Sequence, residues 1–93
     1  MAATNLVQEK KLVPGTTKAT DSLVMEVLGK AGAPMYWGDV ETAVLRLGGD
    51  MPFDAFRTLN GLGYIERADA EKRMLQLTDK GRAAYEQWTK AKA

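Results

Sequence analysis

The first long series of hydrophobic residues follows the spacing of an α-helix that buries one face. That face consists of Leu23, Val24, Val27, Leu28 and Ala31. The same helical wheel places Met25 on the opposite side, which we expect to be exposed. Thr20 or Asp21 can cap the start of this helix, and Gly32 can end it in the left-handed conformation.

Two shorter helices are predicted next. The second begins at Asp39 and ends at Gly48–Gly49, with an apolar face made of Val40, Ala43, Val44 and Leu47. The third begins at Asp50, with an inward face made of Ala55, Phe56, Leu59 and Leu62. Leu45 points away from the core on the wheel. Two short helices joined by a tight turn, the second of them amphipathic, are typical of a helix-turn-helix.

Alternating apolar and polar residues then predict two strands, 64–67 and Met74–Leu77, joined by a charged tip over 68–72. Residues 35–37 are short, aromatic and bounded by Pro and Gly, so they predict a minimal strand. Thr78 can cap a last helix. Its inward face consists of Gly81, Ala84, Tyr85 and Trp88. The expected fold class is therefore α+β, mainly α.

Length and composition restrict the function. The chain has 93 residues, enough for one small domain, which we place at residues 21–90 after a flexible arm at residues 1–20. It contains no Cys and no His, which excludes disulfides, zinc fingers, thiol nucleophiles and imidazole catalysis. The net charge is only +1. No signal peptide or membrane span is predicted, so we expect a cytoplasmic protein that makes no membrane contact.

Enzymatic activity is not expected. The only serine, Ser22, has no histidine to activate it, and the sequence contains no glycine pattern typical of nucleotide binding. We expect no cofactor and no metal. Tyr36, Trp37 and Trp88 could form an aromatic ligand pocket, but packing at the edges of the core is favoured.

The segment LNGLGYIERADAEKRMLQLTDKGRAAYE, which begins at Leu59, resembles part of the winged-helix regulators of the MarR and PadR type. It is similar to their third helix, wing and following helix, whose wings commonly read L-x-x-x-G-L-I-x-R, then a charged tip, then L-T-x-K-G-R. The match extends over residues 20–88 as an architecture. The wing is shorter here than in a typical MarR protein, and the long helices that dimerise those regulators are missing.

The resemblance implies a winged helix-turn-helix with a three-helix core, a β-hairpin wing and a C-terminal helix. It also implies a cytoplasmic, prokaryotic transcription regulator that binds double-stranded DNA. The third helix would enter the major groove. Its outward residues are Phe53, Asp54, Arg57, Thr58 and Asn60. Arg57 could read guanine, Asn60 could read adenine and Thr58 could bind a phosphate, or these residues could form ordinary solvated helix surface.

Basic residues outside the third helix are further candidates for phosphate contacts. The wing contributes Arg67, Lys72 and Arg73, although Asp69 and Glu71 could neutralise them. The arm contributes Lys10, Lys11 and Lys18, which could equally belong to a solubilising tail.

The alternative is a winged-helix module that docks a protein and does not bind DNA. Asp50 and Asp54 lie at the front of the proposed recognition helix, where they would repel phosphate. Met25 and Leu45, with Phe53, could form an apolar surface for a protein partner or a second copy of the chain.

Overall fold

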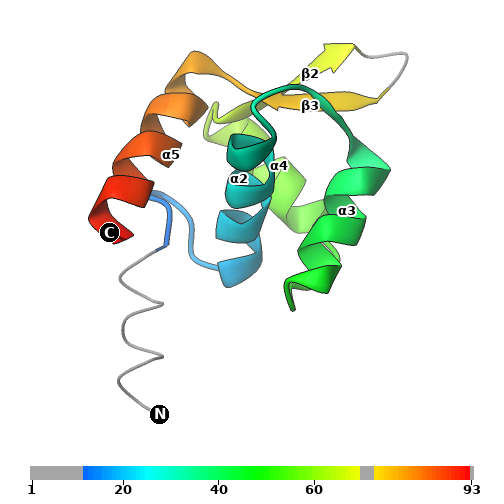
Figure 1. The fold of residues 1–93 in the computed structure, drawn as a ribbon, viewed down its shortest axis with the longest axis horizontal. Helices are drawn as coiled ribbons and strands as arrows, with labels where there is room; N and C mark the ends of the chain where they lie inside the picture. The colour runs from blue at the N-terminus through cyan, green and yellow to red at the C-terminus, as the bar shows by residue number, and fades with distance from the viewer. Residues whose placement is uncertain (1–11, 70–72, 93) are drawn as a thin grey trace.

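The computed structural model describes residues 12–69 and 73–92 (Figure 1). Within these residues the chain forms four helices and a three-stranded antiparallel sheet. The helices are α2 (Ala19–Ala31), α3 (Trp37–Arg46), α4 (Phe53–Gly61) and α5 (Asp79–Lys92). The strands are β1 (Met35–Tyr36), β2 (Ile65–Asp69) and β3 (Met74–Leu77). The prediction of a mainly helical α+β fold is confirmed.

Helix α2 is the centre of the molecule and contacts α3, α4, α5 and β3. Its side chains Val24, Met25 and Leu28 are buried in the core. Met25 has no exposed surface, so the prediction that it belongs to an exposed partner surface is wrong. A helical wheel finds one buried stripe, whereas a helix with neighbours on several sides buries more than one.

The start of α2 also differs from the prediction. The helix begins at Ala19, and the residue before it, Lys18, makes no side-chain capping hydrogen bond. Thr20 instead accepts a hydrogen bond at its Oγ1 from the backbone N–H of Asp50, at 3.0 Å, which ties α2 to the turn before α4. Asp21 lies buried in the first turn of the helix. The end of α2 at Gly32, with a φ of 64°, is as predicted.

The residues that precede α2 pack against the core. Val13 is 1% exposed, and its backbone N–H donates to Ser22 Oγ at 2.9 Å. The Tyr64 hydroxyl donates to the carbonyl oxygen of Pro14 at 2.8 Å. The prediction of a flexible arm is therefore wrong for residues 12–18, while residues 1–11, with Lys10 and Lys11, lie outside the described part of the chain.

Helices α3 and α4 form the predicted pair, with shifted boundaries. Helix α3 begins at Trp37, two residues before Asp39, and buries Val40 and Val44. Leu47, predicted to face inward, is 52% exposed because the helix has ended and the chain turns there. Helix α4 buries Ala55 and Leu59, as predicted.

The sheet has the order β1-β3-β2, so β3 lies between the other two strands. In the β2–β3 ladder, Ile65 pairs with Leu77 and Arg67 pairs with Leu75. Ile65 and Leu77 are buried. Since residues two apart in a strand share a face, Arg67 lies on the same face of the sheet as the core residue Ile65. The hydrophobic face of the hairpin thus continues into a basic side chain.

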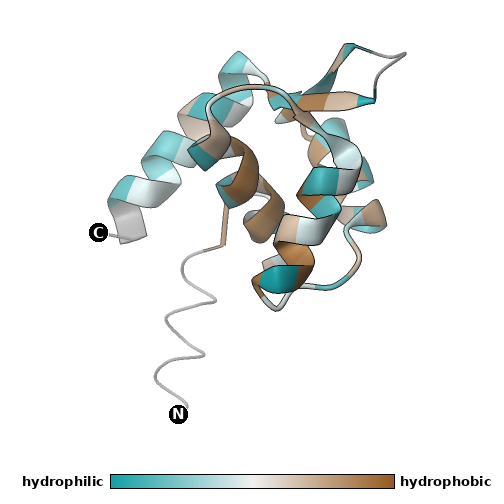
Figure 2. Ribbon diagram, turned by 45° about the vertical axis from the view of Figure 1, so that its right-hand side comes forward, coloured by the Kyte–Doolittle hydropathy of each residue, from teal (hydrophilic) through white to brown (hydrophobic). Residues whose placement is uncertain are grey.

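Helix α5 begins as predicted. The Thr78 hydroxyl accepts a hydrogen bond from the Gly81 N–H at 2.9 Å and donates to the carbonyl oxygen of Gly63. Gly81 is buried, and Trp88 belongs to the core. Figure 2 shows hydrophobic residues concentrated where the helices face one another, whereas α5 is largely hydrophilic.

Two properties of the described residues bear on possible partners. None of their helices has both the length and the apolar character needed to cross a bilayer. They also contain no cluster of three or more His, Cys, Asp or Glu that could hold a metal ion.

Candidate functional site

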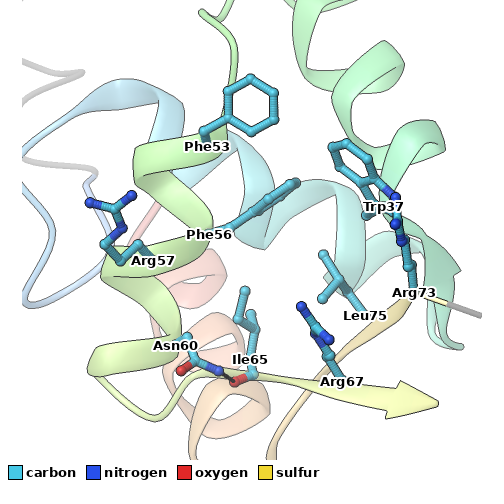
Figure 3. A pocket seen from close by; sticks show the side chains of 9 residues that line it. All are labelled: Trp37, Phe53, Phe56, Arg57, Asn60, Ile65, Arg67, Arg73 and Leu75. Atoms are coloured by element: carbon cyan, nitrogen blue, oxygen red, sulfur yellow. Dashed lines mark hydrogen bonds between the residues drawn. The ribbon is translucent and has the colours of Figure 1, made fainter. Parts of the chain in front are cut away.

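A groove of about 750 Å³ lies between α4 and the sheet, beside the start of α3 (Figure 3). The residues that line it are Trp37, Phe53, Phe56, Arg57, Asn60, Ile65, Arg67, Arg73 and Leu75. They come from three segments that are separate in the sequence. One wall is the exposed side of α4, and the other is the core face of the hairpin as it approaches the tip.

Aromatic rings form one end of the groove. The Trp37 ring centroid is 6.1 Å from that of Phe53 and 6.5 Å from that of Phe56. Phe53 is 53% exposed, whereas Trp37 and Phe56 are half-buried. Trp37 is held near the hairpin because its backbone N–H donates to the carbonyl oxygen of Arg73 at 3.0 Å. The strand β1 that precedes it pairs with β3.

Three arginines bring positive charge to this groove from both walls. Arg57 projects from α4, Arg67 from β2 and Arg73 from the residue before β3 (Figure 3). The Arg73 guanidinium lies over the Trp37 ring, 6.0 Å from its centroid, in a cation–π contact. None of the nine described residues that line the groove is acidic. An anion that enters the groove would therefore meet Arg67 and Arg73 from the hairpin, with the Arg57 guanidinium turned to the outer side of α4 (Figure 3), and no opposing carboxylate from the described lining.

Asn60 links the two walls. Its side-chain Nδ2 donates to the carbonyl oxygen of Ile65 at 3.3 Å, which fixes the end of α4 against the start of β2. This hydrogen bond uses one of the two N–H groups of the amide, which leaves the second N–H and the oxygen for other partners. Asn60 therefore shapes the groove as well as lining it.

The arrangement suits a ligand with both negative charge and flat apolar surface. Guanidinium groups bind phosphate oxygens through charge-assisted, often bidentate hydrogen bonds. Aromatic rings next to them offer stacking or edge contacts to planar groups. Nucleotides combine these two properties, because they carry an anionic phosphate and a planar base.

Five of the residues predicted to bind DNA line the groove: Phe53, Arg57, Asn60, Arg67 and Arg73. Asp54 and Thr58 are exposed on α4 but are not part of the lining. Lys18 is exposed next to α2, and Leu45 is 45% exposed on α3, both outside the groove. Lys72 lies outside the described residues.

Four of the nine lining residues were not among the predicted site residues: Trp37, Phe56, Ile65 and Leu75. Trp37 was expected to pack at the edge of the core, with an aromatic ligand pocket as the alternative, and Phe56 was expected on the inward face of α4. A signal for the position of Arg67 was present, because Ile65 and Arg67 are two residues apart in a strand and must share a face. The pairing of that face with Trp37 depends on the tertiary fold.

Comparison of the chain with models of protein families, with curated proteins and with solved structures found no match.

Proposed function

We propose that this chain is a small winged helix-turn-helix protein that binds double-stranded DNA and regulates transcription in the cytoplasm of a prokaryote. In this assignment α3 and α4 are the helix-turn-helix, α4 is the recognition helix, and the β2–β3 hairpin is the wing. The supporting observation is a groove lined by Arg57, Arg67 and Arg73 that has no acidic residue in its described lining. We assign it no catalytic step and no cofactor.

The roles of the side chains follow from their positions. Arg57 is exposed on α4 and has the fork of donors that reads guanine bidentately in the major groove. Arg67 and Arg73 are exposed on the hairpin and would contact phosphates along one strand. Asp54, exposed at the start of α4, would oppose phosphate there.

A salt titration of duplex DNA binding tests this function. Each phosphate contact contributes a slope of about −0.9 to log affinity against log salt, so three arginines predict a slope of about −2.7. The triple variant Arg57→Ala, Arg67→Ala and Arg73→Ala should lose most of this slope. Arg82→Ala, which removes an exposed arginine from α5, is the matched control and should keep it. Negligible duplex affinity of the parent at low salt would contradict DNA binding.

A second candidate function, docking of a protein partner, is favoured by a different observation. Among the described residues, the exposed large hydrophobic side chains are Tyr36, Leu45, Leu47, Met51 and Phe53. All but Tyr36 fall at the end of α3, in the following turn or at the start of α4. Exposed apolar residues concentrated in this way are typical of an interaction surface.

A further inference from the structure

The aromatic rings at the end of the groove would make few contacts with an intact double helix. Bases in a duplex are stacked on one another, and their flat faces are closed to protein side chains. We propose that the groove binds DNA with unpaired bases, such as a single strand or a strand next to a duplex. A base would stack on Phe53 while arginines hold the flanking phosphates. This inference rests on the proposed function in taking DNA as the partner.

Phe53 is the open stacking surface of the site. Phe53 is 53% exposed and is the first residue of α4, at the mouth of the groove (Figure 3). Trp37 supports the Phe53 ring from 6.1 Å, and the Arg73 guanidinium already lies over the Trp37 ring. A planar base would therefore stack on the Phe53 ring and approach the edge of the Trp37 ring. Proteins that bind single strands combine such aromatic surfaces with a basic groove.

Two arginines of the hairpin lie on the groove near its aromatic end. Arg67 and Arg73 come from the hairpin wall, whereas the Arg57 guanidinium points to the outer side of α4 (Figure 3). All three line a concavity of about 750 Å³, within the range of sites that enclose small ligands. A few nucleotides of one strand would lie along this groove, with a base at the aromatic end and phosphates at the hairpin arginines.

Equilibrium binding to three oligonucleotides of equal length tests the inference: a thymidine single strand, an abasic single strand and a duplex. The abasic strand keeps the phosphates and lacks the bases. We expect the thymidine strand to bind at least about 10-fold more tightly than the abasic strand, because the stacking of one base on an aromatic ring strengthens binding by about this factor. Phe53→Ala should remove this difference. Leu47→Ala, at 52% exposure and outside the groove, is the matched control and should preserve it.

Tryptophan fluorescence gives a second measurement that does not depend on the Phe53 variant. The chain has two tryptophans, of which Trp88 is buried in the core and Trp37 lines the groove. Contact with a base should quench the tryptophan emission of the parent protein when the thymidine strand binds. Binding of the abasic strand should leave the emission unchanged. The variant Trp37→Phe should show no quenching, since Trp88 lies away from the groove.

The outcomes separate this inference from the proposed function. Equal affinity for thymidine and abasic strands, together with salt-dependent duplex binding, would overturn the stacking inference and leave duplex DNA binding intact. Failure of all three oligonucleotides to bind would overturn both. Binding of a polyglutamate peptide of equal charge as tightly as the thymidine strand would show a general anion groove and would also overturn the inference.

Discussion

Arg73 combines an unusual backbone conformation with a side chain at the functional groove. Its φ is 55°, and it is the one described residue other than glycine with a positive φ. A side chain in this left-handed region costs on the order of 1 kcal/mol. Glycine or asparagine would be easier to accommodate there, yet the position carries a guanidinium that reaches both the groove and the Trp37 ring. Strain kept at a ligand-facing residue is consistent with a binding role.

Replacement of Arg73 by glycine should separate stability from binding. Relief of the strained backbone is offset by the greater entropy of glycine in the unfolded chain, so we expect the free energy of unfolding to change by less than about 1 kcal/mol. DNA affinity should fall several-fold. Arg73→Ala, the comparison variant, should show the same loss of affinity. Denaturant unfolding and duplex binding measure the two effects, and unchanged affinity in both variants would remove Arg73 from the site.

Asp21 is a buried carboxyl without a described ion pair. Burial raises the pKa of the Asp21 carboxyl above its ordinary value of 3.8, although the backbone near Lys18 and Thr17 opposes this rise through hydrogen bonds. Since the folded state binds this proton more tightly than the unfolded state, the stability that the proton contributes is present in acid. It is lost as the pH rises through the folded-state pKa.

Asp21→Asn should therefore change the pH dependence of stability. The amide stays neutral, so the variant should gain in melting temperature relative to the parent as the pH rises from acid to neutral. Below the ordinary carboxyl pKa of 3.8 this gain should be absent. Thermal unfolding of both proteins over a pH series measures it. Asp39→Asn, at an exposed position on α3, is the control, and its melting temperature should not gain on that of the parent as the pH rises. If the melting temperatures of Asp21→Asn and the parent change in parallel with pH, the raised pKa of Asp21 is refuted.

At the scale of elements, the contact between α5 and the start of the hairpin depends on one glycine. A Cβ built on Gly81 would overlap the carbonyl oxygen of Tyr64, which is backbone and cannot rotate away. The Tyr64 carbonyl also accepts the Thr78 N–H at 2.9 Å, so the position of the two chains is fixed. The first turn of α5 can approach β2 this closely only without a side chain.

Gly81→Ala should destabilise the fold by about 2 kcal/mol or more, because α5 must move away from Tyr64. Gly61→Ala is the control, since a Cβ there meets nothing within 4 Å, and alanine in a helix should leave stability equal or slightly higher. Denaturant unfolding of the two variants measures the difference. Similar stability for both would mean that α5 is not packed against Tyr64.

The helices and the hairpin could be predicted because their periodicity and their breakers are local. Gly32 ends α2, and Thr78 caps α5, as expected from sequence. The burial of Met25 could not be predicted, because it depends on how many elements surround α2. The groove could be predicted only in part. Arg57 and Arg67 were identified from their segments, but the position of Trp37 in the groove, beside Arg73, requires the pairing of β1 with β3.

At the scale of the whole molecule, the exposed apolar residues decide between a DNA-binding monomer and a docking module. Leu45 is 45% exposed, so Leu45→Lys should remain folded. If the protein is a DNA binder with ordinary surface leucines, the variant should sediment like the parent and bind duplex DNA equally or slightly more tightly, because it adds a positive charge. Loss of self-association or of partner capture would instead support the docking function.

Met25→Lys provides the opposite comparison. This change places an ammonium group in the fully buried centre of α2, and we expect the fold to be lost. Circular dichroism of the two lysine variants measures this contrast. A folded Met25→Lys protein would mean that α2 packs differently from the structure described above.

The order of the sheet has a consequence for how the protein behaves at high concentration. Within the described residues, β1 and β2 are the outer strands of the sheet, and an outer strand such as β2 can pair with strands of other molecules and start aggregation. The charged residues Glu66, Arg67 and Asp69 lie along β2, and its ladder is irregular between Arg67 and Asp69. Charges and bulges of this kind disfavour the regular addition of another strand. Arg67, which lines the groove for an anionic ligand, is therefore also one of the charges that help to keep neighbouring copies from joining edge to edge.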